Sequence, residues 1–131
     1  MRKLVTMCAV VLAIGCGEST SPAVAVEGTW TLQSLNGFPV PFSAPQGNGN
    51  YIELTSDVIT ATSSGTFTQL TVIKTTTNGV VTTESIPDDG TYTVSGNDVT
   101  FSFSSGSAPG TGTIDGNTLT VTTDVILVYK R

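Results

Sequence analysis

The chain has 131 residues, enough for one domain, with five basic, ten acidic and no histidine side chains and a net charge of −5. This acidic balance gives nucleic acid no electrostatic surface to bind, so we predict no nucleic-acid partner. Without histidine, the chain has neither a Ser-His-Asp triad nor an imidazole zinc site. No nucleophile, general base or phosphate loop stands out, so we expect neither enzymatic activity nor a cofactor.

Residues 1–15 are typical of a signal peptide. Arg2 and Lys3 precede an apolar run from Leu4 to Ile14, which is too short to span a bilayer as a helix. The run ends in Ala13-Ile14-Gly15-Cys16, which resembles the lipobox of bacterial lipoproteins. The resemblance implies cleavage before Cys16, a lipid on its sulfur and anchoring to a membrane. An ordinary secretory signal with an incidental cysteine is the alternative.

Residues 16–26 are interpreted as the lipidated cysteine and a flexible tether of small polar residues. Gly17 follows the cysteine, and in lipoproteins of Gram-negative bacteria a residue other than aspartate at this position favours export to the outer membrane. We therefore expect a location in the bacterial cell envelope, lipid-anchored at the outer membrane and facing the periplasm or the surface. The mature chain has no second cysteine, so no disulfide can form within it.

From Glu27 to Arg131, threonine, valine, isoleucine and aromatic residues alternate with polar ones, a pattern that favours half-buried β-strands. Dipeptides typical of tight turns separate the runs; they are Asn36-Gly37, Asn78-Gly79, Asp89-Gly90, Gly96-Asn97 and Gly116-Asn117. We predict nine or ten strands from the ranges 28–35, 51–55, 58–62, 66–76, 80–86, 90–94, 99–104, 111–115, 118–122 and 125–130.

The alternation also predicts which side chains point inward. In four predicted strands the large apolar residues share one face. The groups, one for each strand, are Trp30 with Leu32; Tyr92 with Val94; Val99 with Phe101 and Phe103; and Leu119 with Val121. Strands joined by tight turns form an antiparallel meander, and closing it into a barrel removes the exposed edges. The predicted fold is all-β, a small antiparallel up-and-down barrel of about 8–10 strands. A two-sheet sandwich is the competing solution.

Gly28-Thr29-Trp30 opens the first predicted strand directly after the tether. It resembles the Gly-x-Trp motif of lipocalins, which are up-and-down barrels that bind small apolar ligands. The stretch from Gly90 to Asn97 is similar to one in bacterial lipocalin-like lipoproteins, and the resemblance extends over residues 27–131. It implies that Gly28 and Trp30 close one end of the barrel and that Lys130 or Arg131 packs over the indole. A plain core tryptophan is the alternative.

The resemblance implies noncatalytic binding of a small hydrophobic ligand or lipid inside the barrel. We expect Phe38-Pro39-Val40-Pro41-Phe42 to form a stiff loop, with a lid over an apolar ligand as one hypothesis and a core filling as the other. A mobile loop is expected over residues 43–50. The predicted wall or plug residues are Trp30, Phe38, Phe42, Tyr92, Phe101, Phe103 and Tyr129. The alternative function is a filled barrel that acts as a structural or protein-interaction module of the envelope.

The acidic side chains indicate neither a metal site nor a pair of catalytic carboxylates. Asp88 and Asp89 fit a solvated turn, and because no spacing matches a known calcium loop we predict no metal site. Glu53, Asp57 and Glu84 are the carboxylates available for glycoside chemistry, but the sequence places no two of them together. The last predicted strand is apolar on both faces, which indicates burial on both sides or contact with a partner.

Overall fold

The computed structural model describes residues 24–131, and all ten of its regular elements are β-strands. The predicted signal peptide and Cys16 lie outside the described residues, as does most of the tether. No helix in the described range is long and apolar enough to cross a membrane. The strands are β1 Gly28–Leu35, β2 Phe38–Pro39, β3 Phe42–Gly47, β4 Asn50–Ala61, β5 Thr66–Thr77, β6 Val80–Ser95, β7 Asp98–Phe103, β8 Gly110–Asp115, β9 Thr118–Thr122 and β10 Ile126–Lys130.

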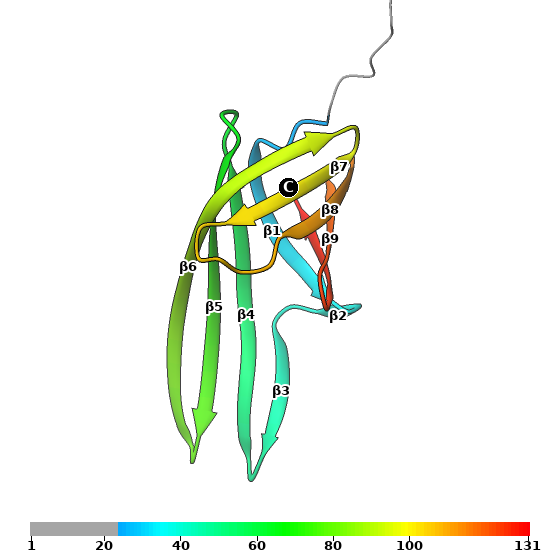
Figure 1. Cartoon of the computed structure of the whole chain (residues 1–131). Helices are drawn as coiled ribbons and strands as arrows, with labels where there is room; N and C mark the ends of the chain where they lie inside the picture. The colour runs from blue at the N-terminus through cyan, green and yellow to red at the C-terminus, as the bar shows by residue number, and fades with distance from the viewer. Residues whose placement is uncertain (1–23) are drawn as a thin grey trace, which may run out of the picture.

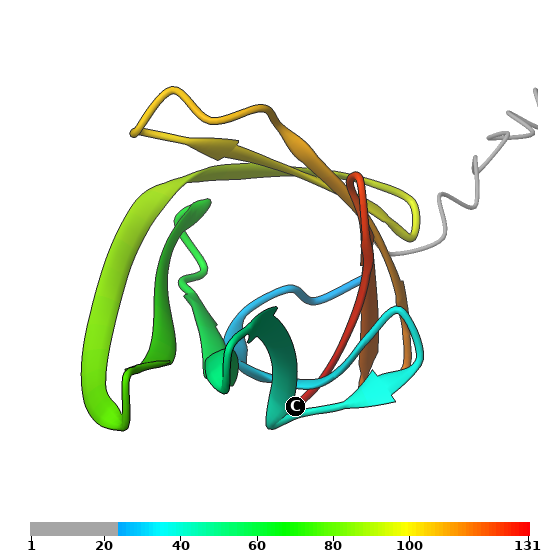
Figure 2. The ribbon, with the colours of Figure 1, turned by 90° about the horizontal axis from the view of Figure 1, so that it is seen from below.

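Eight of the strands close into an antiparallel barrel in up-and-down order. From β4 to β10 each strand pairs with the next along the chain, β10 pairs with β1, and β1 pairs with β4 to close the ring (Figure 2). The short strands β2 and β3 are added to β1 and β4, respectively. The predicted all-β up-and-down barrel is therefore confirmed, and the sandwich is excluded.

The tight turns form where the turn dipeptides predicted them. Asn36 and Asn78 adopt φ of 49° and 51°, and the glycine after each also has a positive φ. Such left-handed pairs match the twist of the two flanking strands in a hairpin. Gly96-Asn97 and Gly116-Asn117 likewise join β6 to β7 and β8 to β9. Asp89-Gly90 was wrongly expected to be a turn, because both residues lie inside β6.

Three expected breaks are absent. β4 runs through Ser56 and Asp57 as one strand, with a bulge at Thr55 where the register shifts between Leu54 and Ser56. β6 runs through Pro87, which lies where the strand has a partner on one side only and an N–H is dispensable. Residues 43–50 do not form a loop, because most of them belong to the β3–β4 hairpin.

The barrel is filled by side chains from all around the ring. Twelve apolar residues form its buried core; they are Val26, Trp30, Leu32, Ile59, Ala61, Phe67, Val99, Phe101, Ile114, Leu119, Val121 and Tyr129. Facing residues of paired strands share a side, so this inner face can be followed from strand to strand. The inward faces predicted for β1, β7 and β9 are confirmed by the burial of their residues.

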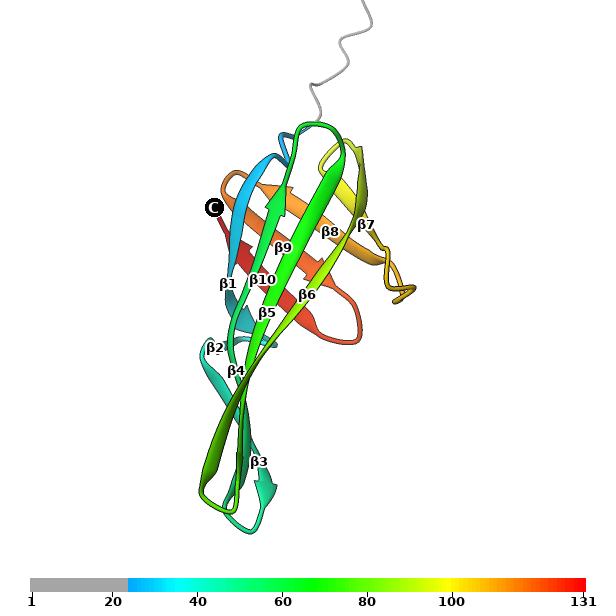
Figure 3. The same ribbon diagram turned by 90° about the vertical axis from the view of Figure 1, so that its left-hand side faces the viewer.

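The strands β4, β5 and β6 are much longer than the barrel is tall. Their far halves, together with β3, project from one end as a four-stranded sheet (Figures 1 and 3). We call this sheet the extension and define it as residues 42–56 and 71–88. Its inner face continues the inner face of the barrel, while its outer face continues the outside. The barrel thus has a closed end beside Trp30 and an opposite mouth from which the extension projects.

Candidate functional site

The closed end of the barrel is built around Trp30. Its ring is fully buried, and its Nε1 donates a hydrogen bond of 2.8 Å to the carbonyl of Val26. The guanidinium of Arg131 lies over the ring, 4.5 Å from its centroid, and donates to the carbonyls of Ala25 at 2.7 Å and Glu27 at 3.2 Å. Of the two basic residues at the end of the chain, Arg131 therefore takes this place, and Lys130, the last residue of β10, is exposed. Gly28, in front of the tryptophan, adopts a φ of 132° and packs against the Arg131 side chain.

Most of the aromatic residues predicted to contact a ligand lie deep in the barrel. Trp30, Phe101 and Tyr129 are almost completely buried in the core. Phe103 is half-buried, and with Phe101 it packs edge-on around the buried ring of Phe67. Tyr92 points inward at the closed end, where its hydroxyl donates to the carbonyl of Thr62. These five rings contact one another or the core, and none of them lies beside Phe38 and Phe42.

Phe38 and Phe42 lie together at the mouth. Their ring centroids are 5.5 Å apart, and Phe38 is 57% exposed while Phe42 is half-buried. The segment between them crosses from the end of β1 to the edge of β4, with Val40 packed against the core. Phe42 faces Leu54 across the β3–β4 pair, so both side chains lie on the inner face.

The inner face at the mouth is apolar beyond these two rings. Leu54 faces Ile73 across β4 and β5, and Leu54 and Leu127 pack against the core from the open side. Ile52, further out, and Ile86, level with Asp57 and Thr71, are on the same face and are among the exposed large hydrophobic residues. We call Phe38, Val40, Phe42, Leu54, Ile73 and Leu127 the mouth surface. Leu54 could not be assigned to it from the sequence, because the bulge at Thr55 reverses which residues of β4 face inward.

A buried polar cluster lies on the inner face between the core and the mouth surface. The Asp57 carboxylate is 6% exposed and accepts hydrogen bonds from Gln69 Nε2 at 2.9 and 2.8 Å and from Thr71 Oγ1 at 3.1 Å. Burial raises the pKa of Asp57, and side-chain hydrogen bonds from Gln69, Thr71 and Tyr129 lower it in part. Burial and the neighbouring carboxylate also raise the pKa of the Tyr129 phenol. A few convergent polar groups beside an apolar surface are typical of small-molecule sites.

The sequence contains a signal for this cluster in the alternation of β4. Asp57, Ile59 and Ala61 alternate at the end of β4 and share the inner face, so the carboxylate stands where the pattern calls for an apolar residue. Gln69 directly faces Ile59, and Thr71 faces Asp57. The same polar residues, Ser56 and Asp57, also fit a break between two strands, which the sequence predicts and the structure does not show.

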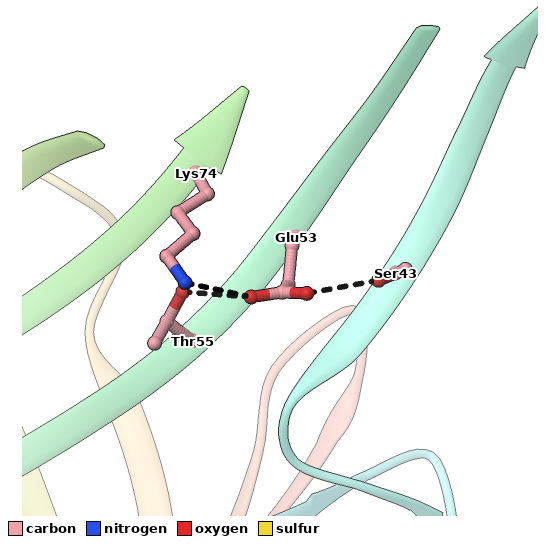
Figure 4. Close-up of polar contacts among 4 residues, drawn as sticks. All are labelled: Ser43, Glu53, Thr55 and Lys74. Carbon is pink, nitrogen blue, oxygen red and sulfur yellow. Dashed lines mark hydrogen bonds and ion pairs between the residues drawn. The ribbon is translucent and has the colours of Figure 1, made fainter. Parts of the chain in front are cut away.

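Other hollows lie on the outside of the molecule. An open groove of about 810 Å³ crosses the outer face of β4, β5 and β6, where Val58, Leu70 and Pro87 provide its apolar side chains. A smaller pocket lies on the outer face of the extension around Glu53. The Glu53 carboxylate there is 3.8 Å from Lys74 Nζ and accepts hydrogen bonds from Ser43 and Thr55 (Figure 4). Exposed pairs of this kind contribute little to stability.

The carboxylates considered for catalysis are not gathered into one site. Glu53 faces outward on β4, whereas Asp57 and Glu84 face inward on β4 and β6 and lie at different levels. Asp88 and Asp89 accept hydrogen bonds from the hydroxyls of Ser105 and Ser104. Within residues 24–131, no group of three or more acidic, cysteine or histidine side chains is arranged to hold a metal ion.

The fold and the closed end define an up-and-down barrel of the lipocalin type. The sequence matches the lipocalin-like domain family over residues 26–129, and the chain belongs to that family. The match begins two residues before β1 and includes all ten strands except the end of the last one. No curated protein matches the chain.

Proposed function

We propose that the protein binds a small apolar molecule, without catalysis, at the mouth surface. The observation that carries this proposal is the aromatic pair of exposed Phe38 and half-buried Phe42, which continues an apolar inner face out of the barrel. The core below is filled, so the ligand is held against the mouth surface and not beside Trp30. Of the seven aromatic residues predicted to contact the ligand, the proposal therefore keeps Phe38 and Phe42, which lie at the opening.

The binding energy in this proposal comes from burial of apolar surface. Removing about 300 Å² of ligand and protein apolar surface from water is worth about 7 kcal/mol, from which the cost of association is subtracted. A micromolar affinity requires about 8 kcal/mol, so we expect micromolar binding or weaker for a short alkyl chain. The Asp57 cluster lies next to the mouth surface, and it disfavours a ligand that places a carboxylate there.

We also propose that the chain is a lipoprotein anchored through Cys16 in the bacterial envelope. Support comes from the apolar segment that ends in Ala13-Ile14-Gly15-Cys16 and from the closed end, where Val24 donates to the carbonyl of Gly96. Val24, the first described residue, thus lies at the closed end of the barrel, away from the mouth surface. A Cys16→Ser variant should appear in the soluble periplasmic fraction, whereas the parent should sediment with membranes and carry acyl mass.

Native mass spectrometry of residues 17–131 tests the binding proposal. This fragment keeps Ala25 and Val26, whose carbonyls bind Arg131 and Trp30, so the closed end stays intact. We expect an apolar molecule to co-purify from the periplasm, or to be taken up from a lipid extract, and to be released on denaturation. The matched control is Leu70→Ala in the outer groove, which should not reduce binding. Bare protein after incubation with the extract would contradict the proposal and favour the filled-barrel alternative.

A further inference from the structure

Beyond the mouth surface, the extension is a single layer of sheet that no other part of the described chain covers. A sheet of this kind normally requires a second layer or another strand to be stable. Eight large hydrophobic residues are exposed in the described part of the chain, and five of them lie in the extension. These five are Tyr51, Ile52, Val80, Val81 and Ile86.

The extension has two free edges among the described residues, and only one of them is suited to pairing with another strand. The β3 edge contains Pro45 and is interrupted by a register shift before Gly47, which are features that prevent strand addition. The other edge is β6 from residue 80 to 87, which pairs with β5 on one side only, because contacts on its other side begin at Asp88 and Asp89 (Figure 3). Its sequence from Val80 to Ile86 is rich in β-branched residues and carries a single charge, Glu84.

We propose that this edge of β6 pairs with the same edge of a second copy of the chain. The segment 80–86 is complementary to itself in antiparallel register about a two-fold axis at Thr83. In that register Val80 faces Ile86 of the second copy, and this contact occurs twice. Val80 is 65% exposed and Ile86 is 41% exposed in the single chain, so the pairing covers both.

The same register keeps the two Glu84 carboxylates apart, and the features at both ends of the segment explain where the pairing stops. Glu84 faces Thr82 of the second copy, so the two carboxylates are not directly opposed. Pairing stops at one end at the turn Asn78-Gly79 and at the other at Pro87, which has no N–H to donate. The product is one continuous eight-stranded sheet that joins two barrels.

The solution mass of residues 17–131, measured by light scattering during size-exclusion chromatography over a wide concentration range, tests this proposal. We expect a dimer at high concentration. Thr83→Glu should abolish it, because like charges meet on the two-fold axis, while within one chain the new carboxylate faces Lys74 and is tolerated. Thr111→Glu adds the same charge on exposed β8, far from this edge, and should leave the dimer intact. A monomer at every concentration, or a dimer unaffected by Thr83→Glu, would overturn the proposal.

Cross-linking tests the register independently. The fragment 17–131 contains no cysteine, so a single introduced thiol has no competitor. Residues directly opposed in an antiparallel pair have Cα atoms about 4.5–5.5 Å apart, which suits a disulfide. Thr83→Cys should therefore form a covalent dimer under mild oxidation much faster than Thr111→Cys. Equal rates for the two variants would rule out pairing about Thr83.

Discussion

Replacing Phe38 and Phe42 together by alanine separates a binding role from a core role for the mouth surface. Phe38 is 57% exposed, so less than half of the burial energy of a phenylalanine, about 1 kcal/mol, is lost with it. Phe42 is half-buried and contributes a similar amount, and the contact between the rings, at 5.5 Å, adds about 1 kcal/mol. The double variant should therefore lose about 3 kcal/mol of unfolding free energy.

The matched control for this double variant is Phe67→Ala. Phe67 is buried, 2% exposed, and packs edge-on against Phe101 and Phe103 at 5.1 and 5.3 Å. Removing such a ring from a core costs about 3–5 kcal/mol, so one core substitution should cost as much as both mouth substitutions. Urea unfolding gives both free energies.

Binding of a fluorescent alkyl probe gives the second readout for the same variants. We expect the Phe38→Ala/Phe42→Ala variant to stay folded and to bind the probe at least tenfold more weakly, which corresponds to about 1.4 kcal/mol. Phe67→Ala, measured under conditions where it is folded, should keep most of the affinity. Unfolding of the double variant, or undiminished binding by it, would refute the assignment of the mouth surface as the binding site.

Three further predictions concern stability. Arg131→Ala should lose about 1–2 kcal/mol in urea unfolding, since it removes the cation over the indole and its hydrogen bonds, whereas Lys130→Ala should change stability by less than about 0.5 kcal/mol. Gly90→Ala should cost about 3 kcal/mol or prevent folding, because its Cβ would lie 1.9 Å from the Ser102 carbonyl oxygen; a variant with parental stability would contradict this packing. The pKa of Asp57 is raised in the folded state above its ordinary value of 3.8, so the folded state binds this proton more tightly. Its contribution to stability is therefore largest below pH 3.8 and is lost as the pH rises through the folded pKa, a dependence that Asp57→Asn should remove from the stability–pH profile.

The barrel was predictable because its short strands follow simple rules. Strands β1 and β9 have the predicted bounds, β5, β8 and β10 differ from theirs by one residue at one end, and β7 is shifted by one residue at both ends. The period of two holds through most of these strands, with one register shift in β1 between Leu32 and Ser34, and asparagine–glycine turns fix hairpin register. The resemblance of Gly28-Thr29-Trp30 to the lipocalin Gly-x-Trp motif predicts which end of the barrel Trp30 occupies.

The extension was not predictable, because its strands break the local rules that mark strand ends. Pro87 normally ends a strand, but it is tolerated where β6 lacks a second partner. Asp57 normally faces water, but it is buried by long-range contacts with Gln69, Thr71 and Tyr129. The mouth surface depends on the bulge at Thr55, which only the paired strands reveal.

Photo-cross-linking with an alkyl probe that carries a diazirine tests the central claim most directly. Peptide mapping of labelled residues 17–131 locates the bound chain without any substitution. We predict labelling within residues 38–42 and at Leu54 and Ile73, all on the mouth surface. Labelling confined to Val58, Leu70 and Pro87 in the outer groove, or no labelling above that of unfolded protein, would contradict the account.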